Sequence, residues 1–179
     1  KIIFEMTQTN QRSNTMGLKE SFGNTLKTFA RIFPGISDYQ DKESLRGQDK
    51  VVREHLADLL NKQVKSLDEL KIRLIEAKKI ELLGKLELTT KKISKLSDMI
   101  KHSSYGYSPI FASDAVDQKK LKKIYEYDIS LAGEIRKLDQ DINSILETAN
   151  LSLDTTVFDE LEHRLSRLEN LIVGRKKYA

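Results

Sequence analysis

The stretch Leu45–Lys101, LRGQDKVVREHLADLLNKQVKSLDELKIRLIEAKKIELLGKLELTTKKISKLSDMIK, decides the fold. It contains no proline, and its apolar residues recur every three or four positions, the spacing of a helix packed along a seam. The rhythm shifts by about one position near Ala77 and then resumes. We therefore expect one long helix over 45–101, about 85 Å long at 1.5 Å per residue. Its predicted seam consists of Leu56, Leu60, Leu67, Leu70, Leu74, Leu82, Leu86, Ile93, Leu96 and Ile100.

Composition supports an all-α fold class. Hydrophobic residues make up 39% and charged residues 32%, a balance that suits long helices with narrow buried seams. The absence of cysteine excludes disulfides, thiolate catalysis and cysteine-ligated zinc. No run approaches the roughly 20 apolar residues of a membrane span, so we expect a cytoplasmic protein. The net charge of +4 is too small to indicate a nucleic-acid partner.

Two later segments, 117–149 and 154–173, repeat the helical apolar pattern. Asp117 and Asp154 stand at their starts as N-caps, and the loop that contains Pro109 predicts a reversal of direction. We expect an elongated antiparallel helical hairpin, extended to a three-helix coiled-coil bundle over part of its length. A tip left uncovered would need a second copy of the chain, so we also expect a homo-oligomer. The predicted stripes are Leu121, Ile124, Tyr125, Leu131, Ile135, Leu138, Ile142 and Ile145, followed by Phe158, Leu161, Leu165, Leu168 and Ile172.

The chain divides into four predicted parts. Residues 1–16 are expected to be a disordered arm or a tag, and residues 17–34 a short amphipathic helix that ends at Pro34-Gly35. Residues 37–174 form the helical-hairpin domain, and residues 175–179 a basic tail.

The amphipathic helix carries a candidate binding face. Aromatic and aliphatic side chains gather on one side and basic side chains on the other, as in helices that lie in a lipid interface. The same face would also suit packing onto the bundle as an extra helix, or a groove on a partner protein. The residues of this membrane or partner face are Leu18, Phe22, Leu26, Phe29 and Phe33, with Lys27 and Arg31 opposite.

A second candidate surface combines the aromatic loop with a basic cluster that follows it. Aromatic rings beside lysines can capture a partner, and lysines at a helix N-terminus attract an anionic group. The alternatives are a packed hairpin tip for the aromatics and simple solubility for the lysines. The residues concerned are Tyr105, Tyr107, Phe111, Lys119, Lys120, Lys122 and Lys123. Farther along, Tyr125, Tyr127 and Asp128 predict a seam with one buried hydrogen-bond network.

Catalytic motifs are largely absent. There is no glycine-rich phosphate loop and no G-x-S-x-G elbow. Glu160-x-x-His163 matches one copy of the motif that helical di-iron proteins use twice, and in a chain rich in glutamate we favour a chance match on a solvated helix face. We expect no metal, no cofactor and no enzymatic activity.

Two pairs of segments resemble an uncharacterised group of bacterial helical proteins. One pair is ISDYQDKE (36–43) with DKVVREH (49–55), and the other is SYGY (104–107) with LKKIYEYD (121–128). A short amphipathic helix ahead of a long hairpin is also similar in architecture to the phage-shock membrane-maintenance proteins, and charged hairpins are similar to membrane-bending BAR domains. The likeness implies work at a membrane surface and assigns no catalytic residue.

These observations predict a non-enzymatic scaffold or adaptor that self-associates, with contact of residues 18–33 with an anionic membrane surface left open beside their packing on the bundle. One alternative is a soluble module that binds another protein through Tyr105–Phe111. The other is a metal-binding helical-bundle protein that uses Glu160 and His163.

Overall fold

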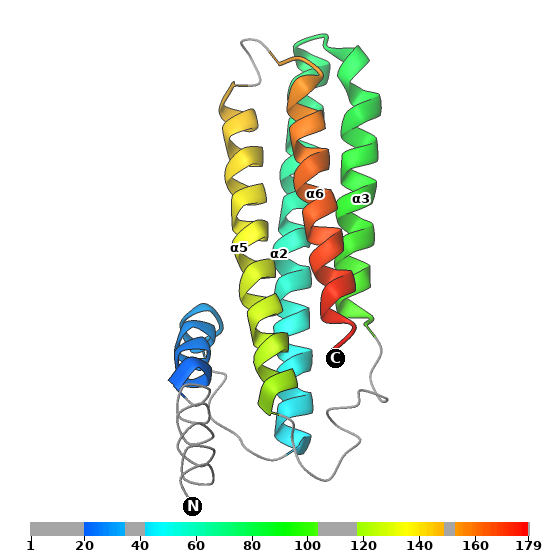
Figure 1. The fold of residues 1–179 in the computed structure, drawn as a ribbon. Helices are drawn as coiled ribbons and strands as arrows, with labels where there is room; N and C mark the ends of the chain where they lie inside the picture. Colours follow the sequence, from blue (N-terminus) through cyan, green and yellow to red (C-terminus); the bar gives the residue numbers. More distant parts are fainter. Residues whose placement is uncertain (1–19, 35–41, 104–117, 149–152, 179) are drawn as a thin grey trace, which may run out of the picture.

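The computed structural model describes residues 20–34, 42–103, 118–148 and 153–178, and every regular element within these ranges is a helix (Figure 1). The predicted all-α class is therefore confirmed. The predicted arm at 1–16 and the Pro109 loop lie outside the described residues. The elements are a helix over residues 20–32 (hereafter helix 20–32), α2 (Lys42–Glu76), η1 (Ile80–Leu82), α3 (Leu83–Lys101), α5 (Gln118–Thr148) and α6 (Thr156–Arg175).

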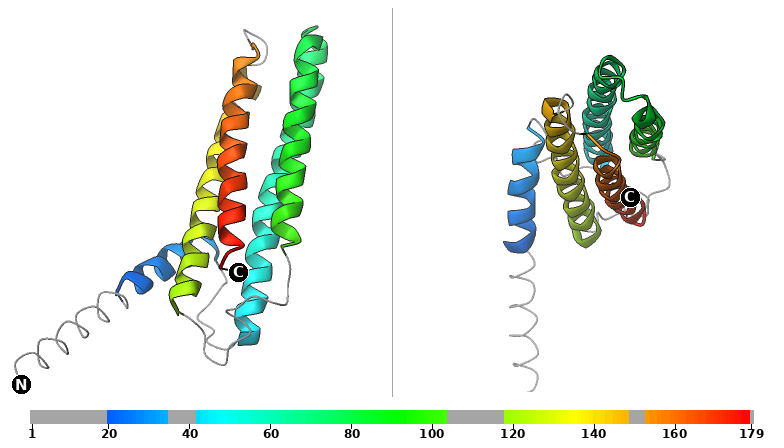
Figure 2. Two further views of the ribbon diagram at one scale, coloured as in Figure 1. Left: turned by 45° about the vertical axis from the view of Figure 1, so that its right-hand side comes forward. Right: turned by 90° about the horizontal axis from the view of Figure 1, so that it is seen from above.

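The four long helices form a bundle. Seen along its axis, α2, α3, α6 and α5 stand at the corners of a quadrilateral, and each packs on two neighbours (Figure 2). The chain runs up α2, down α3, up α5 and down α6 (Figure 1). Two antiparallel hairpins, α2–α3 and α5–α6, thus lie side by side. Helix 20–32 sits outside the bundle, against the lower part of α5.

The predicted uninterrupted helix over 45–101 is wrong, because the chain reverses after Glu76. Lys79 N–H donates to Leu74 O (2.9 Å) and Lys78 N–H donates to Ile75 O (3.0 Å), the two bonds of a Schellman C-cap. Lys78 has the left-handed φ of 59° that this cap requires. Such a position usually holds glycine, since a Cβ is strained there. The only sequence signal of the break was the shift in apolar rhythm near Ala77.

The predicted apolar ridge is buried throughout, but its cover differs from the expected one. Every seam residue from Leu56 to Ile100 is at most 2% exposed, and the stripes of α5 and α6 are buried as predicted. Because α3 folds back onto α2, the two halves of the predicted ridge lie on facing helices and bury each other. The hairpin α5–α6 completes the enclosure. The expected three-helix arrangement is thus replaced by four helices, and the core itself leaves no open ridge that requires a second copy.

A ladder of lysines aligns the two hairpins. Four lysines between Lys79 and Lys95 each donate to a residue 74 positions later in the chain, and Lys92 also pairs with Glu162. The constant separation shows that α3 and α6 run parallel in one register. Exposed ion pairs contribute about 0–1 kcal/mol each, so the ladder sets alignment while the apolar core supplies most of the stability. The acceptors are Leu153 O, Asp159, Ser166 and Glu169.

The last helix starts close to the predicted position, with Thr155 rather than Asp154 as its N-cap, and it ends differently. Asp154 Oδ1 accepts a hydrogen bond from the first helical N–H, that of Thr156 (2.8 Å), and Leu153 and Phe158 are both buried nearby in the core. Arg175, predicted to open a basic tail, is instead the last residue of α6 and only 4% exposed.

Replacing Lys78 by glycine tests the reversal. Glycine removes the strain of the left-handed residue, so Lys78→Gly should raise the free energy of unfolding by about 0.5–1 kcal/mol in urea denaturation. Ala77→Gly, one residue earlier in the helical last turn, is the matched control and should lower it by a similar amount. A continuous helix would lose stability with both substitutions.

Candidate interaction site

Helix 20–32 is held on the bundle by its aromatic stripe. Phe29 of this helix is 1% exposed, and Phe33, the residue directly after its end, is 3% exposed. Phe29 stacks on Tyr125 of α5 with ring centroids 4.2 Å apart, and Phe22 lies 6.4 Å from the same ring. Phe33 meets His55 of α2 edge-on at 5.8 Å. The face predicted for lipid or a partner therefore docks on α5 and α2 in this structure, which corresponds to the extra-helix alternative.

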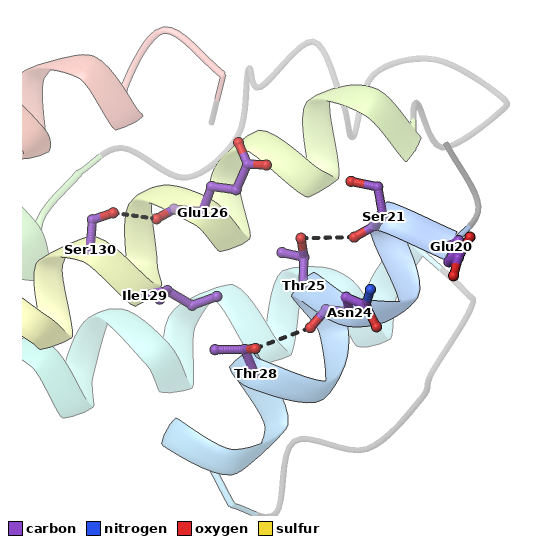
Figure 3. Close-up of a pocket in the computed structure, with 8 residues that line it drawn as sticks. All are labelled: Glu20, Ser21, Asn24, Thr25, Thr28, Glu126, Ile129 and Ser130. Atoms are coloured by element: carbon purple, nitrogen blue, oxygen red, sulfur yellow. Dashed lines mark hydrogen bonds between the residues drawn. The ribbon is translucent and has the colours of Figure 1, made fainter. Parts of the chain in front are cut away.

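A polar edge accompanies this aromatic contact. Lys122 Nζ of α5 donates to Ser21 Oγ at 2.5 Å, a link between residues 101 positions apart that no local pattern announces. Beside it, Ser21, Thr25 and Thr28 line a shallow groove opposite Ser130 of α5 (Figure 3). The hydroxyls of both threonines and of Ser130 donate to backbone carbonyls of their own helices. The groove is thus a polar seam between two packed helices.

The remaining residues of the predicted face are placed as follows. Leu26 is half-buried beside the aromatic contact, and Lys27 and Arg31 are exposed on the opposite side. Leu18 lies outside the described residues. Within the described part of the chain, no helix is both long and apolar enough to cross a membrane.

The basic cluster of α5 is partly neutralised by its own helix. Glu126 pairs with Lys123 (2.8 Å) and with Lys122 (3.5 Å). The hydrogen bond from Lys123 lowers the pKa of Glu126, and Glu126 raises the pKa of Lys123 in return. Lys119 and Lys120 begin the same helix. The aromatic residues Tyr105, Tyr107 and Phe111 lie outside the described residues, so their capture of a partner stays a prediction.

A buried network of charges ties all four long helices together at one end of the bundle. Arg175 of α6 donates through Nε to Asp128 Oδ1 of α5 (2.6 Å) and through Nη2 to Asp49 Oδ1 of α2 (2.6 Å). Arg53 of α2 donates to Asp49 Oδ2 (2.8 Å) and to the carbonyl of Lys101, the last residue of α3 (2.7 Å). Asp128 is 1% exposed, so the buried network predicted for this residue is confirmed.

Electrostatics show why this network must stay complete. Burial raises the pKa of Asp128, and the two-point contact with Arg175 opposes that rise. Burial alone would also raise the pKa of Asp49, but Arg175 and Arg53 together hold it below its usual value. Each buried charge has an opposite charge in contact, an arrangement whose disruption is costly. The parts played by Asp49, Arg53 and Arg175 were missed in the sequence. The four-residue spacing of Asp49 and Arg53 on α2 could have indicated their ion pair, whereas the contacts of Arg175 with α5 and α2 have no local spacing.

The candidate metal motif lies on the surface. Glu160 and His163 are both exposed on the outer side of α6. Among the described residues, no group of three or more His, Asp or Glu side chains is placed to hold a metal ion.

Breaking the Arg175 network should lower the free energy of unfolding far more than breaking an exposed ion pair. Arg175→Met leaves Asp128 and Asp49 without their shared partner and should lower the free energy of unfolding by about 3–5 kcal/mol. Adding Asp128→Asn should restore part of that loss, since a neutral amide needs no counter-charge. The matched control is Arg167→Met, which removes an exposed arginine 3.7 Å from Glu134 and should cost less than about 1 kcal/mol. Equal losses in denaturant titrations would contradict the network.

Removing one ring should release helix 20–32 without unfolding the bundle. Phe29→Ala deletes the stack on Tyr125, so amide hydrogen exchange over residues 20–33 should accelerate while α3 and α6 keep their protection. Arg31→Ala, on the exposed side of the same helix, is the control and should leave the exchange pattern nearly unchanged. Uniform loss of protection in Phe29→Ala would show that helix 20–32 is an integral part of the core.

Comparison with known proteins returns no match. No protein-family model matches the chain, no curated protein matches its sequence, and no solved structure matches its fold. The resemblance to bacterial helical proteins and the architectural likeness to phage-shock proteins therefore stay predictions.

Proposed function

We propose that this chain is a non-enzymatic helical scaffold or adaptor that self-associates. Within the described bundle, five of the six buried polar side chains, all but Thr89, hydrogen-bond to another helix. Arg175 and Asp128 bond each other, and Ser97 Oγ donates to the carbonyl of Ala57 across the α2–α3 seam (3.1 Å). These side chains therefore stabilise the fold, and we expect binding to other molecules on the outer surface of the bundle.

One observation carries the proposal: large apolar side chains stay exposed on both sides of the α2–α3 reversal. Ile72, Ile75 and Ile80 are all about half exposed there, outside a core that is otherwise closed. Exposed apolar side chains that cluster mark contact surfaces more often than isolated ones do. An elongated bundle with an apolar end suits a protein that works by joining to others.

A membrane surface is a second proposed partner, and it sets a condition on helix 20–32. Phe29 and Phe33 face the bundle, so contact with lipid requires the helix to leave α5. Each enclosed phenylalanine opposes that release by about 1.5–3 kcal/mol. The exposed Lys27 and Arg31 favour an anionic surface once the helix is free.

Light scattering on the full chain tests self-association. The mass should rise with concentration from 20.6 kDa toward twice that value. A mass that stays at 20.6 kDa up to the highest soluble concentration would contradict the proposal.

For the membrane partner, co-sedimentation with phosphatidylserine vesicles should pellet the wild type more than a variant that carries both Phe22→Glu and Phe29→Glu. Equal pelleting would remove helix 20–32 from any membrane role.

A further inference from the structure

Three half-exposed isoleucines lie within nine residues of one another in the chain, on both sides of the α2–α3 reversal. Ile72 and Ile75 lie three residues apart in the last turns of α2, and Ile80 follows directly after the reversal, with exposed fractions of 58%, 49% and 56%. Lys71, the residue before Ile72 in α2, pairs with Glu87 of α3 at 3.6 Å, so the two helices lie side by side at this level of the bundle. Leu88 directly follows Glu87 in α3, whereas Val51 near the start of α2 and Val173 near the end of α6 belong to the other end of the bundle, and single exposed apolar residues are ordinary for a protein surface.

Charges of both signs surround these isoleucines. Glu76, Lys78 and Glu81 are exposed around the reversal, and none of them takes part in an ion pair within the described residues. A surface that carries both an acid and a base is complementary to itself when a two-fold axis relates two copies. Lys78 of one copy would then oppose Glu76 and Glu81 of the other, as electrostatic complementarity favours.

We propose that the reversal patch, comprising Ile72, Ile75, Ile80, Glu76, Lys78 and Glu81, is where a second copy of this chain docks. This inference rests on the proposed self-association and names its surface. Three half-exposed side chains supply much less apolar area than the roughly 800 Å² per partner of a standard interface, so the dimer is weak and concentration-dependent. The patch lies at the end of the bundle opposite helix 20–32, and the dimer leaves that helix accessible in both copies (Figure 1).

A charged residue in the patch should disrupt the dimer. Ile75→Lys should raise the dissociation constant at least tenfold in sedimentation equilibrium, because the ammonium group would be buried against isoleucines. Val173→Lys is the matched control, since Val173 is 48% exposed against 49% for Ile75 and lies near the opposite end of the bundle. It should change the constant less than twofold. Equal effects of the two variants would overturn the proposed surface.

Charge reversal tests the two-fold pairing directly. Lys78→Glu places three like charges at the patch, and Glu76→Lys with Glu81→Lys does the same with the opposite sign, so each variant alone should associate less than wild type. A mixture of the two should recover association as a heterodimer. Failure to recover would contradict the pairing. If wild type associates and no patch variant changes it, the surface is wrong while the scaffold proposal stands; a wild type that never associates removes both.

Discussion

The reversal between α2 and α3 is the constraint on which the rest of the structure depends. The N–H of Lys79 bonds back to the carbonyl of Leu74, and the left-handed Lys78 turns the chain so that α3 lies against α2. One apolar ridge is thereby divided between two facing helices. The hairpin α5–α6 then has a complementary hairpin to pack on, and the lysine ladder of α3 fixes their register.

Different interactions hold the two ends of the bundle together. At the reversal end, backbone capping turns the chain and leaves isoleucines on the outside. At the other end, Arg175 joins Asp128 and Asp49 in a network that reaches every long helix through Arg53. The same end carries helix 20–32 (Figure 1), whose Phe22 and Phe29 pack on Tyr125. An apolar end suited to association and an end with a docked amphipathic helix give the molecule two distinct surfaces.

The spacing of apolar residues along the chain predicted most of the fold, whereas contacts between residues far apart in the sequence were not predicted. The apolar stripes of all the long helices were correct because side-chain spacing reports directly which face is buried. The break near Ala77 was missed because lysine replaces the glycine that usually marks such a cap. Arg175 was assigned to a tail because basic residues at a helix end have a local explanation in the helix dipole. At the candidate site, the aromatic face was predicted, but its docking and the Lys122–Ser21 link depend on segments far apart in sequence.

A single distance measurement tests the reversal most directly. The chain has no cysteine, so Asp58→Cys and Asp98→Cys can carry two spin labels without interference, and both positions are exposed. Their neighbours Ala57 and Ser97 are hydrogen-bonded to each other at 3.1 Å. Pulsed electron resonance should therefore give a short distance, set by the roughly 8–10 Å between packed helix axes plus the label arms. A distance near about 60 Å, the span of one unbroken helix between the labels, would contradict the four-helix arrangement.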